Sequence, residues 1–442
     1  DGVLDSVGEV FIEQGIRSWA GQQPYVYSFE VGLEMTAAGQ VESARFRRAD
    51  QPDAWQALDV HDSDEGEEWY FEVEGDDLSV FDPYGDVVYI IEVTPTVGDA
   101  QTITVDYSDP DSGAALVQPS QMPQFTGLYP YMTGVPTQTT FAWAPITDPS
   151  IVSLELEVEV YDDAEGGWAE LGEFALAPDA TSSGEVALEA DRHYQVGMLW
   201  DNSREGDTPE GVPFFITKYT ELEMPFSTQT GVFDPILEGY ILQGVQDLAG
   251  GQSLGAFEFG FTAASTDWFQ EAFVQTPGGQ TYVLDEYEPL DVGGDWWFEI
   301  ESDDPADLSD FTGGLYTLIL EFTDGFRAAT RFEFADPDTH EPIVPPASAP
   351  VFVTPADGAT DVAPGTAFIW EAIDDPNVAA VELDVENTDL GRDAFEVELD
   401  PTATSYAPGA PLADQAAHEA WLSFFTGHAD LTNDDGVAFS AG

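Results

Sequence analysis

A repeat at a fixed spacing constrains the fold of this 442-residue chain more than any other feature. Trp143 and Trp370 end the triplets Phe-Ala-Trp and Phe-Ile-Trp, and they are separated by 227 positions (370 − 143 = 227). The Asp-Pro pairs that begin at Asp148 and Asp375 have the same separation (375 − 148 = 227). Two segments that align over this length without a gap predict an internal duplication.

The duplication extends over the whole chain. The segment 69–74 matches 296–301, again 227 positions apart (296 − 69 = 227), and the segment 29–32 matches 257–260. His193 aligns with His418 at a separation of 225 (418 − 193 = 225), and both are predicted to be structural histidines at a strand start. We therefore predict two copies of a two-domain unit in the order A-B-A-B, with the domains A1 at 1–114, B1 at 115–229, A2 at 230–342 and B2 at 343–442.

Strand-like alternation dominates the chain, and helical periodicity is scarce. In the segment 154–160, leucine and valine alternate with glutamate, which is the pattern of a half-buried antiparallel strand. Many short segments of this kind, bounded by Gly, Pro, Asp and Asn, are typical of sandwiches and barrels. We predict an all-β fold of four tandem antiparallel β-sandwich domains.

The B domains also carry a family motif. In B2, the sequence Pro-Ala-Asp-Gly-Ala-Thr-Asp-Val from Pro355 to Val362 precedes the triplet that ends at Trp370. This arrangement resembles the opening of fibronectin type III-like or Ig-like domains in large extracellular bacterial proteins. The resemblance covers the B domains only. It implies a β-sandwich in which the tryptophan of the second strand, Trp143 or Trp370, fills the core, and it implies no particular chemistry.

The charge balance excludes several classes of partner. The chain has 10 basic and 86 acidic residues, a net charge of −76, and no cysteine. Such a field repels nucleic acid and anionic lipid, and the lack of cysteine excludes disulfides and thiolate metal sites. No run of residues is apolar enough to span a membrane. We expect an extracellular or cell-surface protein, in a mature or trimmed form that begins at Asp1.

No group in the sequence is set apart for catalysis. Pairs of acids arise by chance at every spacing among 86 acidic residues, whereas a catalytic acid needs an isolated, desolvated setting. The sequence has no nucleophile elbow, phosphate loop or His-Glu-x-x-His motif. We therefore predict a protein that is not an enzyme and has no catalytic residues.

Tryptophans near predicted turns are candidates for stacking on sugars, and those in strands are expected in the core. The first group comprises Trp19, Trp55, Trp168 and Trp268, and the second comprises Trp143, Trp200, Trp296 and Trp370.

Acidic residues at the expected A–B junctions favour calcium, which takes roughly six to eight oxygen ligands. In a fibronectin-like sandwich, the N-terminus, the loop after the second strand and the loop after the sixth strand lie at one end. These positions carry Asp109, Asp111, Asp148, Asp201 and Asp207 in the first unit, and Asp336, Asp338, Asp375, Asp430 and Asp434 in the second. Bound calcium would stiffen an A–B hinge; the alternative is that these residues are ordinary solvated turns.

B2 stops before the segment that closes B1. Gly211 aligns with Gly436, and B1 then continues through Lys218 and Phe226 as a plausible last strand, whereas B2 stops at the position equivalent to Thr217. Two explanations stay open: the natural chain continues further, or a segment of a neighbouring molecule completes B2 by strand addition. Residues 1–10 are a candidate donor, which would join subunits head to tail into polymers.

The sequence thus predicts a non-enzymatic extracellular structural protein: a spacer, matrix or filament subunit, assembled by strand complementation and stiffened by calcium. The alternative is a carbohydrate-binding or adhesive module array at the cell surface. Ordered polymers would favour the first function, and a glycan signal that depends on Trp or Tyr residues would favour the second.

Overall fold

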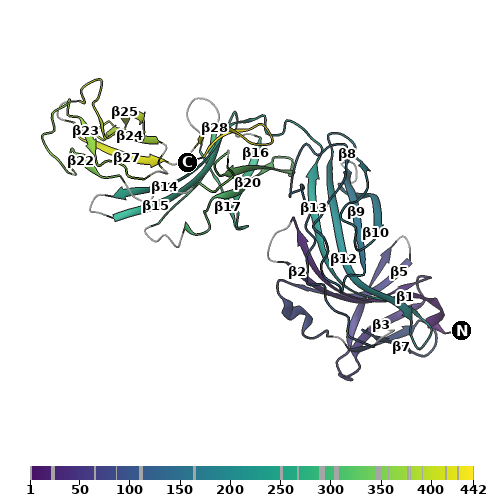
Figure 1. The fold of residues 1–442 in the computed structure, drawn as a ribbon. Helices are drawn as coiled ribbons and strands as arrows, with labels where there is room; N and C mark the ends of the chain where they lie inside the picture. The colour runs from purple at the N-terminus through teal and green to yellow at the C-terminus, as the bar shows by residue number, and fades with distance from the viewer. Residues whose placement is uncertain are drawn as a thin grey trace. The chain divides into compact units, whose positions relative to one another are not determined.

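The computed structural model divides the chain into two compact units, Asp1–Thr230 (unit 1) and Gly231–Gly442 (unit 2), next to the predicted start of the second copy (Figure 1). No helix in the described part of the chain is long and apolar enough to cross a membrane. The structure describes every residue except 1, 21–24, 64–65, 86, 109–112, 163–165, 249–251, 266–267, 288–293, 303–307, 338, 344–349, 357, 376–377, 379, 391, 414–415, 426–427 and 442.

The A1 region of unit 1 is a β-sandwich. Its strands pair in the order β1-β2-β5-β4-β3-β6-β7, and the two ends of this sheet enclose a core that includes Phe29, Tyr89 and Ile103. The elements are η1 (Val3–Ser6), β1 (Val7–Trp19), β2 (Val26–Met35), β3 (Val41–Arg48), β4 (Gln56–Ser63), β5 (Gly66–Gly75), η2 (Leu78–Phe81), β6 (Val88–Pro95) and β7 (Gln101–Asp106).

The B1 region is a second sandwich, in which the sheet β10-β9-β12-β13 encloses a core with the short pair β8–β11. Its strands are β8 (Gln138–Thr139), β9 (Ser153–Asp162), β10 (Gly167–Leu176), β11 (Val186–Ala187), β12 (His193–Asp207) and β13 (Pro213–Ser227). Because β13 also pairs with β1, the A1 and B1 sheets form one continuous sheet of 11 strands.

The alternating pattern explains these strands. In β9, Leu154, Leu156 and Val158 are buried in the B1 core, and the intervening glutamates lie on the opposite face. Successive residues of a strand point to opposite faces, so leucine–glutamate alternation buries one face and solvates the other. The all-β prediction is confirmed, and the only helical elements in the described residues are 3-10 turns.

Unit 2 repeats this architecture. In its A2 region the strands are β14 (Ile236–Leu248), β15 (Gln252–Ala263), β16 (Phe269–Gln275), β17 (Thr281–Val283), β18 (Asp285–Tyr287), β19 (Gly294–Ser302), β20 (Gly314–Phe322) and β21 (Arg327–Phe334). In its B2 region they are β22 (Phe352–Thr354), β23 (Phe368–Trp370), β24 (Ala380–Asn387), β25 (Arg392–Leu399), β26 (Ser405–Tyr406) and β27 (His418–Phe425), followed by β28 (His428–Thr432) and β29 (Ala438–Ala441).

The order of the strands is the same in both units. The sheet β18-β19-β15-β14-β29-β28 of unit 2 corresponds to β4-β5-β2-β1-β13-β12 of unit 1, and β17-β16-β20-β21 corresponds to β4-β3-β6-β7. The register of the central pair agrees too, since Val10 is opposite Phe214 and Gly239 is opposite Phe439.

One predicted alignment is wrong by a residue. In unit 1 Tyr194 is opposite Val160, and in unit 2 His418 is opposite Asn387, 227 positions after Val160. His418 is therefore equivalent to Tyr194 and not to His193. A shift of one residue moves every side chain of a strand to the other face. The shift is not apparent from the sequence, because Gly211 and Gly436, in the hairpins that follow, are separated by 225 positions, the same separation as His193 and His418.

The predicted core tryptophans are buried. Trp143 and Trp370 are each 2% exposed, and Trp200 and Trp296 are also in the core. The indole of Trp143 donates to the Ala180 carbonyl at 2.9 Å, and that of Trp370 donates to the Ala403 carbonyl at 2.8 Å. The implied role of this tryptophan in each B sandwich is therefore confirmed.

Candidate functional site: the β1–β13 ladder

A ladder of parallel strands joins the two sandwiches of unit 1. Ten residue pairs, from Val10–Phe214 to Trp19–Glu223, connect β1 to β13 without a register shift. We call this pairing the β1–β13 ladder. Figure 1 shows β12 and β13 extending as long neighbouring strands to the place where β1 lies.

Strand β13 belongs to both cores. Phe214 and Ile216 are buried in the A1 core, and Leu222, Met224 and Phe226 are buried in the B1 core. All five are even-numbered, so both cores lie against the same face of the strand. Neither sandwich is complete without β13, and the ladder is therefore the structural link between them.

The connection from A1 to B1 is attached to the ladder by side-chain hydrogen bonds. The Tyr107 hydroxyl donates to the Thr217 carbonyl at 2.7 Å, and the Gln118 side chain donates to the Tyr219 carbonyl at 2.7 Å. The Thr220 hydroxyl donates to the Gln121 carbonyl at 2.9 Å. The predicted A–B hinge is therefore wrong for unit 1, because a continuous sheet and these bonds fix the junction.

The face of the ladder that points away from the cores, here called the outer face, is centred on Tyr219. Its ring lies over Gly15, where an added Cβ would be 2.3 Å from the ring Cζ. Arg17 donates to the Tyr219 hydroxyl from Nε at 2.9 Å and from Nη2 at 2.6 Å. Arg17 also forms ion pairs with Glu221 at 3.4 Å and Glu74 at 3.8 Å.

Carboxyl groups surround this single guanidinium. Burial, reinforced by neighbouring carboxylates, raises the pKa of Glu13, Glu30 and Glu221 to about 7 in each case. Burial also raises the pKa of Tyr219 to about 12. Desolvation disfavours a charged carboxylate, and like charges nearby act in the same direction. These groups escaped prediction because only the pairing of β1 with β13, some 200 residues apart, brings them together.

Unit 2 has the corresponding pair but different chemistry. Gly239, Tyr240 and Ile241 of β14 pair with β29 in the same parallel sense. By this register, Leu242 takes the place of Glu13, and Gln246 takes the place of Arg17.

The hairpin of β28 and β29 packs into A2 in the same way as the end of the β12–β13 hairpin packs into A1. Val437 and Phe439 are buried in the A2 core. The last strand before the B2 sequence stops thus serves A2, and the sheet β25-β24-β27 has no strand on the far side of β27 in the part of the chain that the structure describes. In unit 1 that place is occupied by β13.

The proposed donor of a closing strand is wrong. Val3, Val7 and Val10 are buried in the A1 core, and β1 pairs with β2 on one side and with β13 on the other. Residues 2–10 of this donor are therefore part of unit 1 and are not free to add to B2 of another molecule, and Asp1 lies outside the described residues.

The predicted calcium ligands do not come together as expected in unit 1. Asp201 and Asp207 were placed in a loop, but both lie in β12, where six residues of extended strand span roughly 20 Å. Asp148 accepts bonds from the backbone and hydroxyl groups of Ser120 and Ser150, an arrangement of a structured turn. Asp109 and Asp111 lie outside the described residues.

In unit 2, Asp336 accepts bonds from Thr339, and its carboxyl group lies 3.5 Å from Nε2 of His428. Asp375 and Asp434 lie in the turn before β24 and in the β28–β29 turn. Asp338 and the side chain of Asp430 lie outside the described residues. Within the described part of the chain, no three His, Cys, Asp or Glu residues form a group that would hold a metal ion. Calcium binding stays a prediction.

Three of the four tryptophans predicted near turns are exposed: Trp19 by 42%, Trp168 by 39% and Trp268 by 48%. They lie on different elements, and Trp168 contacts the ring of Tyr161 edge to face at 5.4 Å. Trp55 instead packs against arginines, with the guanidinium carbons of Arg45 and Arg47 at 4.4 and 4.9 Å from its ring centre.

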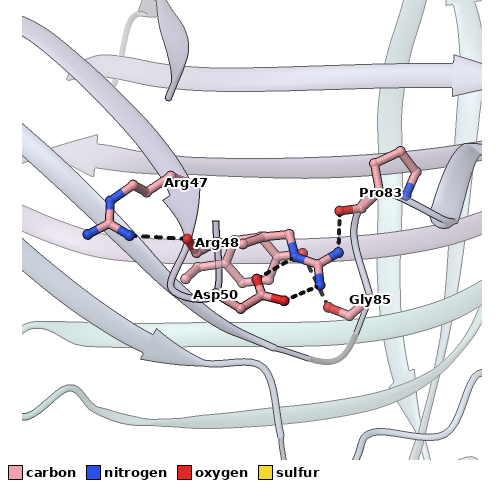
Figure 2. Close-up of polar contacts among 6 residues, drawn as sticks. Arg47, Arg48, Asp50, Pro83 and Gly85 are labelled. Atoms are coloured by element: carbon pink, nitrogen blue, oxygen red, sulfur yellow. Dashed lines mark hydrogen bonds and ion pairs between the residues drawn. The ribbon is translucent and has the colours of Figure 1, made fainter. Parts of the chain in front are cut away.

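The arginines of β3 form the densest basic cluster, three of the ten basic residues. Figure 2 shows Arg48 held by both oxygens of Asp50, at 2.9 and 2.8 Å, and by the Pro83 carbonyl at 2.8 Å. Arg45 forms an ion pair with Glu92 at 2.6 Å. Since acids of the same region neutralise these two arginines, we assign the cluster a structural role.

Comparisons with known proteins add little to this geometry. No family model and no curated protein matches the chain. Among solved structures, it is similar to the crystal structure of the chicken CNTN1 FN1-FN3 domains, with 12% identity, 74% of this chain and 98% of that chain covered, and a TM-score of 0.15. At that TM-score the similarity supports no conclusion about the arrangement or the function of this chain.

Proposed function

We propose that the chain is a non-enzymatic, extracellular or surface-displayed spacer that bears tension, with the β1–β13 ladder as its load-bearing element. The observation that carries this proposal is the parallel pairing of the first strand of unit 1 with its last. The ladder joins both sandwiches, so A1 and B1 cannot separate while it is intact.

The direction of the two strands determines how a force acts on the ladder. Tension on the ends of unit 1 pulls β1 toward Val7 and β13 toward Ser227, which are opposite directions along parallel strands. The ten pairs are therefore loaded in shear, and their hydrogen bonds share the force. Force applied at one end of the ladder would instead break the bonds one after another.

Force spectroscopy on the full chain tests this, and the absence of cysteine allows handles at chosen sites. In a shear variant, Ser6→Cys and Thr230→Cys place the handles before β1 and after β13. In a peeling variant, Ser6→Cys and Pro209→Cys place both at the same end of the ladder. We expect a clearly higher rupture force in shear. Equal forces in the two geometries would contradict the load-bearing role.

Self-association remains part of the proposal, and its support is that no strand is hydrogen-bonded to the far side of β27 in the described part of the chain, where β14 lies near β27 without pairing. A strand that paired with β27 would have the character of Thr217–Ser227, which carries apolar residues on one face and pairs with β12 in unit 1. A labelled peptide of that sequence should bind the full chain and raise the melting temperature of B2. A peptide with its apolar residues replaced by serine is the control, and equal binding of the two would contradict the proposal.

Calcium stiffening is proposed on the acidic residues alone. After chelation, the melting temperature is measured with added calcium chloride and with sodium chloride at equal ionic strength. The comparison distinguishes binding at a calcium site from general screening of the negative charges. A larger shift with calcium would support the proposal, and equal shifts would contradict it.

Carbohydrate binding is a second candidate, favoured by the exposure of Trp19, Trp168 and Trp268. Exposed aromatic rings offer a flat apolar surface with limited entropy to lose on binding. A glycan array that gives a signal with the native chain and none with the three tryptophans changed to alanine would establish it. An array without any signal would contradict carbohydrate binding, and the structural role would be the one proposal that stands.

A further inference from the structure

The outer face of the β1–β13 ladder gathers many acids around one cation. The facing groups are Glu9, Glu13 and Arg17 of β1; Tyr219, Glu221 and Glu223 of β13; Asp201 and Glu205 of β12; Glu155, Glu157 and Glu159 of β9; Glu30 and Glu34 of β2; Glu68, Tyr70, Glu72 and Glu74 of β5; and Asp59 and His61 of β4, of which His61 stacks on Tyr70. Arg17 is the only arginine or lysine among them, and its contacts go to Tyr219, Glu221 and Glu74.

We propose that the β1–β13 ladder is a proton-sensitive joint, which is tightest when Glu13, Glu30 and Glu221 carry protons and weakens when they ionise. This inference deepens the load-bearing proposal and rests on it for its biological meaning. The placement of the three groups supports it. Glu13 of β1 lies opposite Glu30 of β2, and it also interacts with Glu221 of β13, so repulsion centred on Glu13 acts across the ladder and across the neighbouring β1–β2 pair.

The direction of the effect follows from the pKa values. Burial raises the pKa of each of the three carboxyl groups from 4.5 to about 7 in the folded chain. A raised folded-state pKa means that the folded chain holds protons more tightly than the unfolded chain does. The resulting stabilisation is fully present below pH 4.5, decreases between pH 4.5 and 7, and is lost above about pH 7.

This behaviour is opposite to that of a carboxylate stabilised by a salt bridge, whose protein loses stability as the pH falls. Unit 2 provides an internal comparison, because Leu242 and Gln246 stand where unit 1 has Glu13 and Arg17. Its remaining outer-face acids, such as Glu258 and Glu299, also have raised pKa values because of burial. We therefore expect a smaller pH dependence in unit 2, and not its absence.

Urea unfolding of the full chain at several values between pH 5 and 8 tests the inference. At each urea concentration, a hydrogen-exchange pulse at one fixed pH followed by mass spectrometry measures how far each unit is unfolded. Peptides from β1 and β13 report on unit 1, and peptides from β14 and β15 report on unit 2. We expect the urea midpoint of unit 1 to fall from pH 5 to pH 8 by more than that of unit 2. An equal fall in both units, or a rise, would overturn the proposal.

Amide variants identify the groups responsible. Glu13→Gln and Glu221→Gln mimic the protonated form, so each should raise the midpoint of unit 1 at pH 8 and change it little at pH 5. Glu185→Gln is the matched control: Glu185 is exposed and precedes β11, and its replacement alters the net charge equally. The same increase at pH 8 from the control would show a general charge effect and would overturn the proposal.

A direct titration covers the case in which a variant fails to fold. Carbon-13 NMR of glutamate side-chain carboxyl groups in the native chain should show three groups that titrate near pH 7. If all glutamates titrated near 4.5, the proposal would be overturned. Neither measurement applies force, so these results stand apart from the rupture forces that decide the load-bearing role.

Discussion

Unit 1 and unit 2 share one order of strands but differ in how their A and B regions are joined. In unit 1, β13 runs through both cores and pairs with β1 over ten residues. In unit 2, β29 pairs with β14 over three residues, and no strand belongs to both the A2 and the B2 sheet in the part of the chain that the structure describes. The shared strand therefore predicts stronger coupling between A1 and B1 than between A2 and B2.

The core tryptophans give the largest expected effect. Trp143→Ala and Trp370→Ala each remove an indole that is 2% exposed, and such a change costs about 3–5 kcal/mol. Because β13 serves both cores of unit 1, we expect Trp143→Ala to increase hydrogen exchange in B1 and A1 together. Trp370→Ala should increase it in B2 alone.

Mass spectrometry of the exchanged peptides distinguishes these patterns, with peptides of the unchanged unit as the control. If A1 kept its protection while B1 lost it, the two cores would be independent, and the shared strand would not couple them.

The sequence was sufficient for the duplication, the all-β fold and the buried tryptophans, because spacing and alternation are local properties of the chain. It was insufficient for the site. The grouping of Glu13 with Glu221 depends on the pairing of strands about 200 residues apart, and β12 was expected to end at a loop near Asp201. The acidic composition of the segment Asp201–Asp207 is typical of a turn. The segment instead continues strand β12, because the longer β12–β13 hairpin buries Phe214 and Ile216 in the A1 core.

Two equivalent glycines provide a sharper test of the ladder. At Gly15 an added Cβ would be 2.3 Å from Cζ of the Tyr219 ring, whereas at Gly244 there is nothing within 4 Å. Gly15→Ala should displace the ring from Arg17 and cost about 1–3 kcal/mol, as overpacking usually does. Gly244→Ala should be neutral or stabilise unit 2 by up to about 1 kcal/mol, because alanine restricts the unfolded chain.

Urea unfolding with readout by unit measures both glycine variants. Since the two positions are matched, each variant controls for the general effect of alanine in a strand. Equal costs at Gly15 and Gly244 would mean that the Tyr219 ring can move freely, and that the outer face does not hold the ladder in place.

The hairpin tips give the smallest effect and test whether insertion of the B hairpin into the A core is similar in the two units. In unit 2 the Thr330 hydroxyl, which is fully buried, donates to Asp435 at 2.6 Å and accepts from Asn433 at 2.7 Å. In unit 1 the Thr104 hydroxyl donates to Glu210 at 3.1 Å in an exposed position. Thr330→Val should therefore cost about 1–2 kcal/mol, and Thr104→Val less than about 0.5 kcal/mol, because water replaces only the exposed bond easily.

Thermal melting resolved by unit compares the stability costs of the two variants. If Thr104→Val were the costlier change, the β1–β13 ladder would depend on the hydrogen bond at its hairpin tip, and the ten strand pairs would not be enough to hold the hairpin in A1.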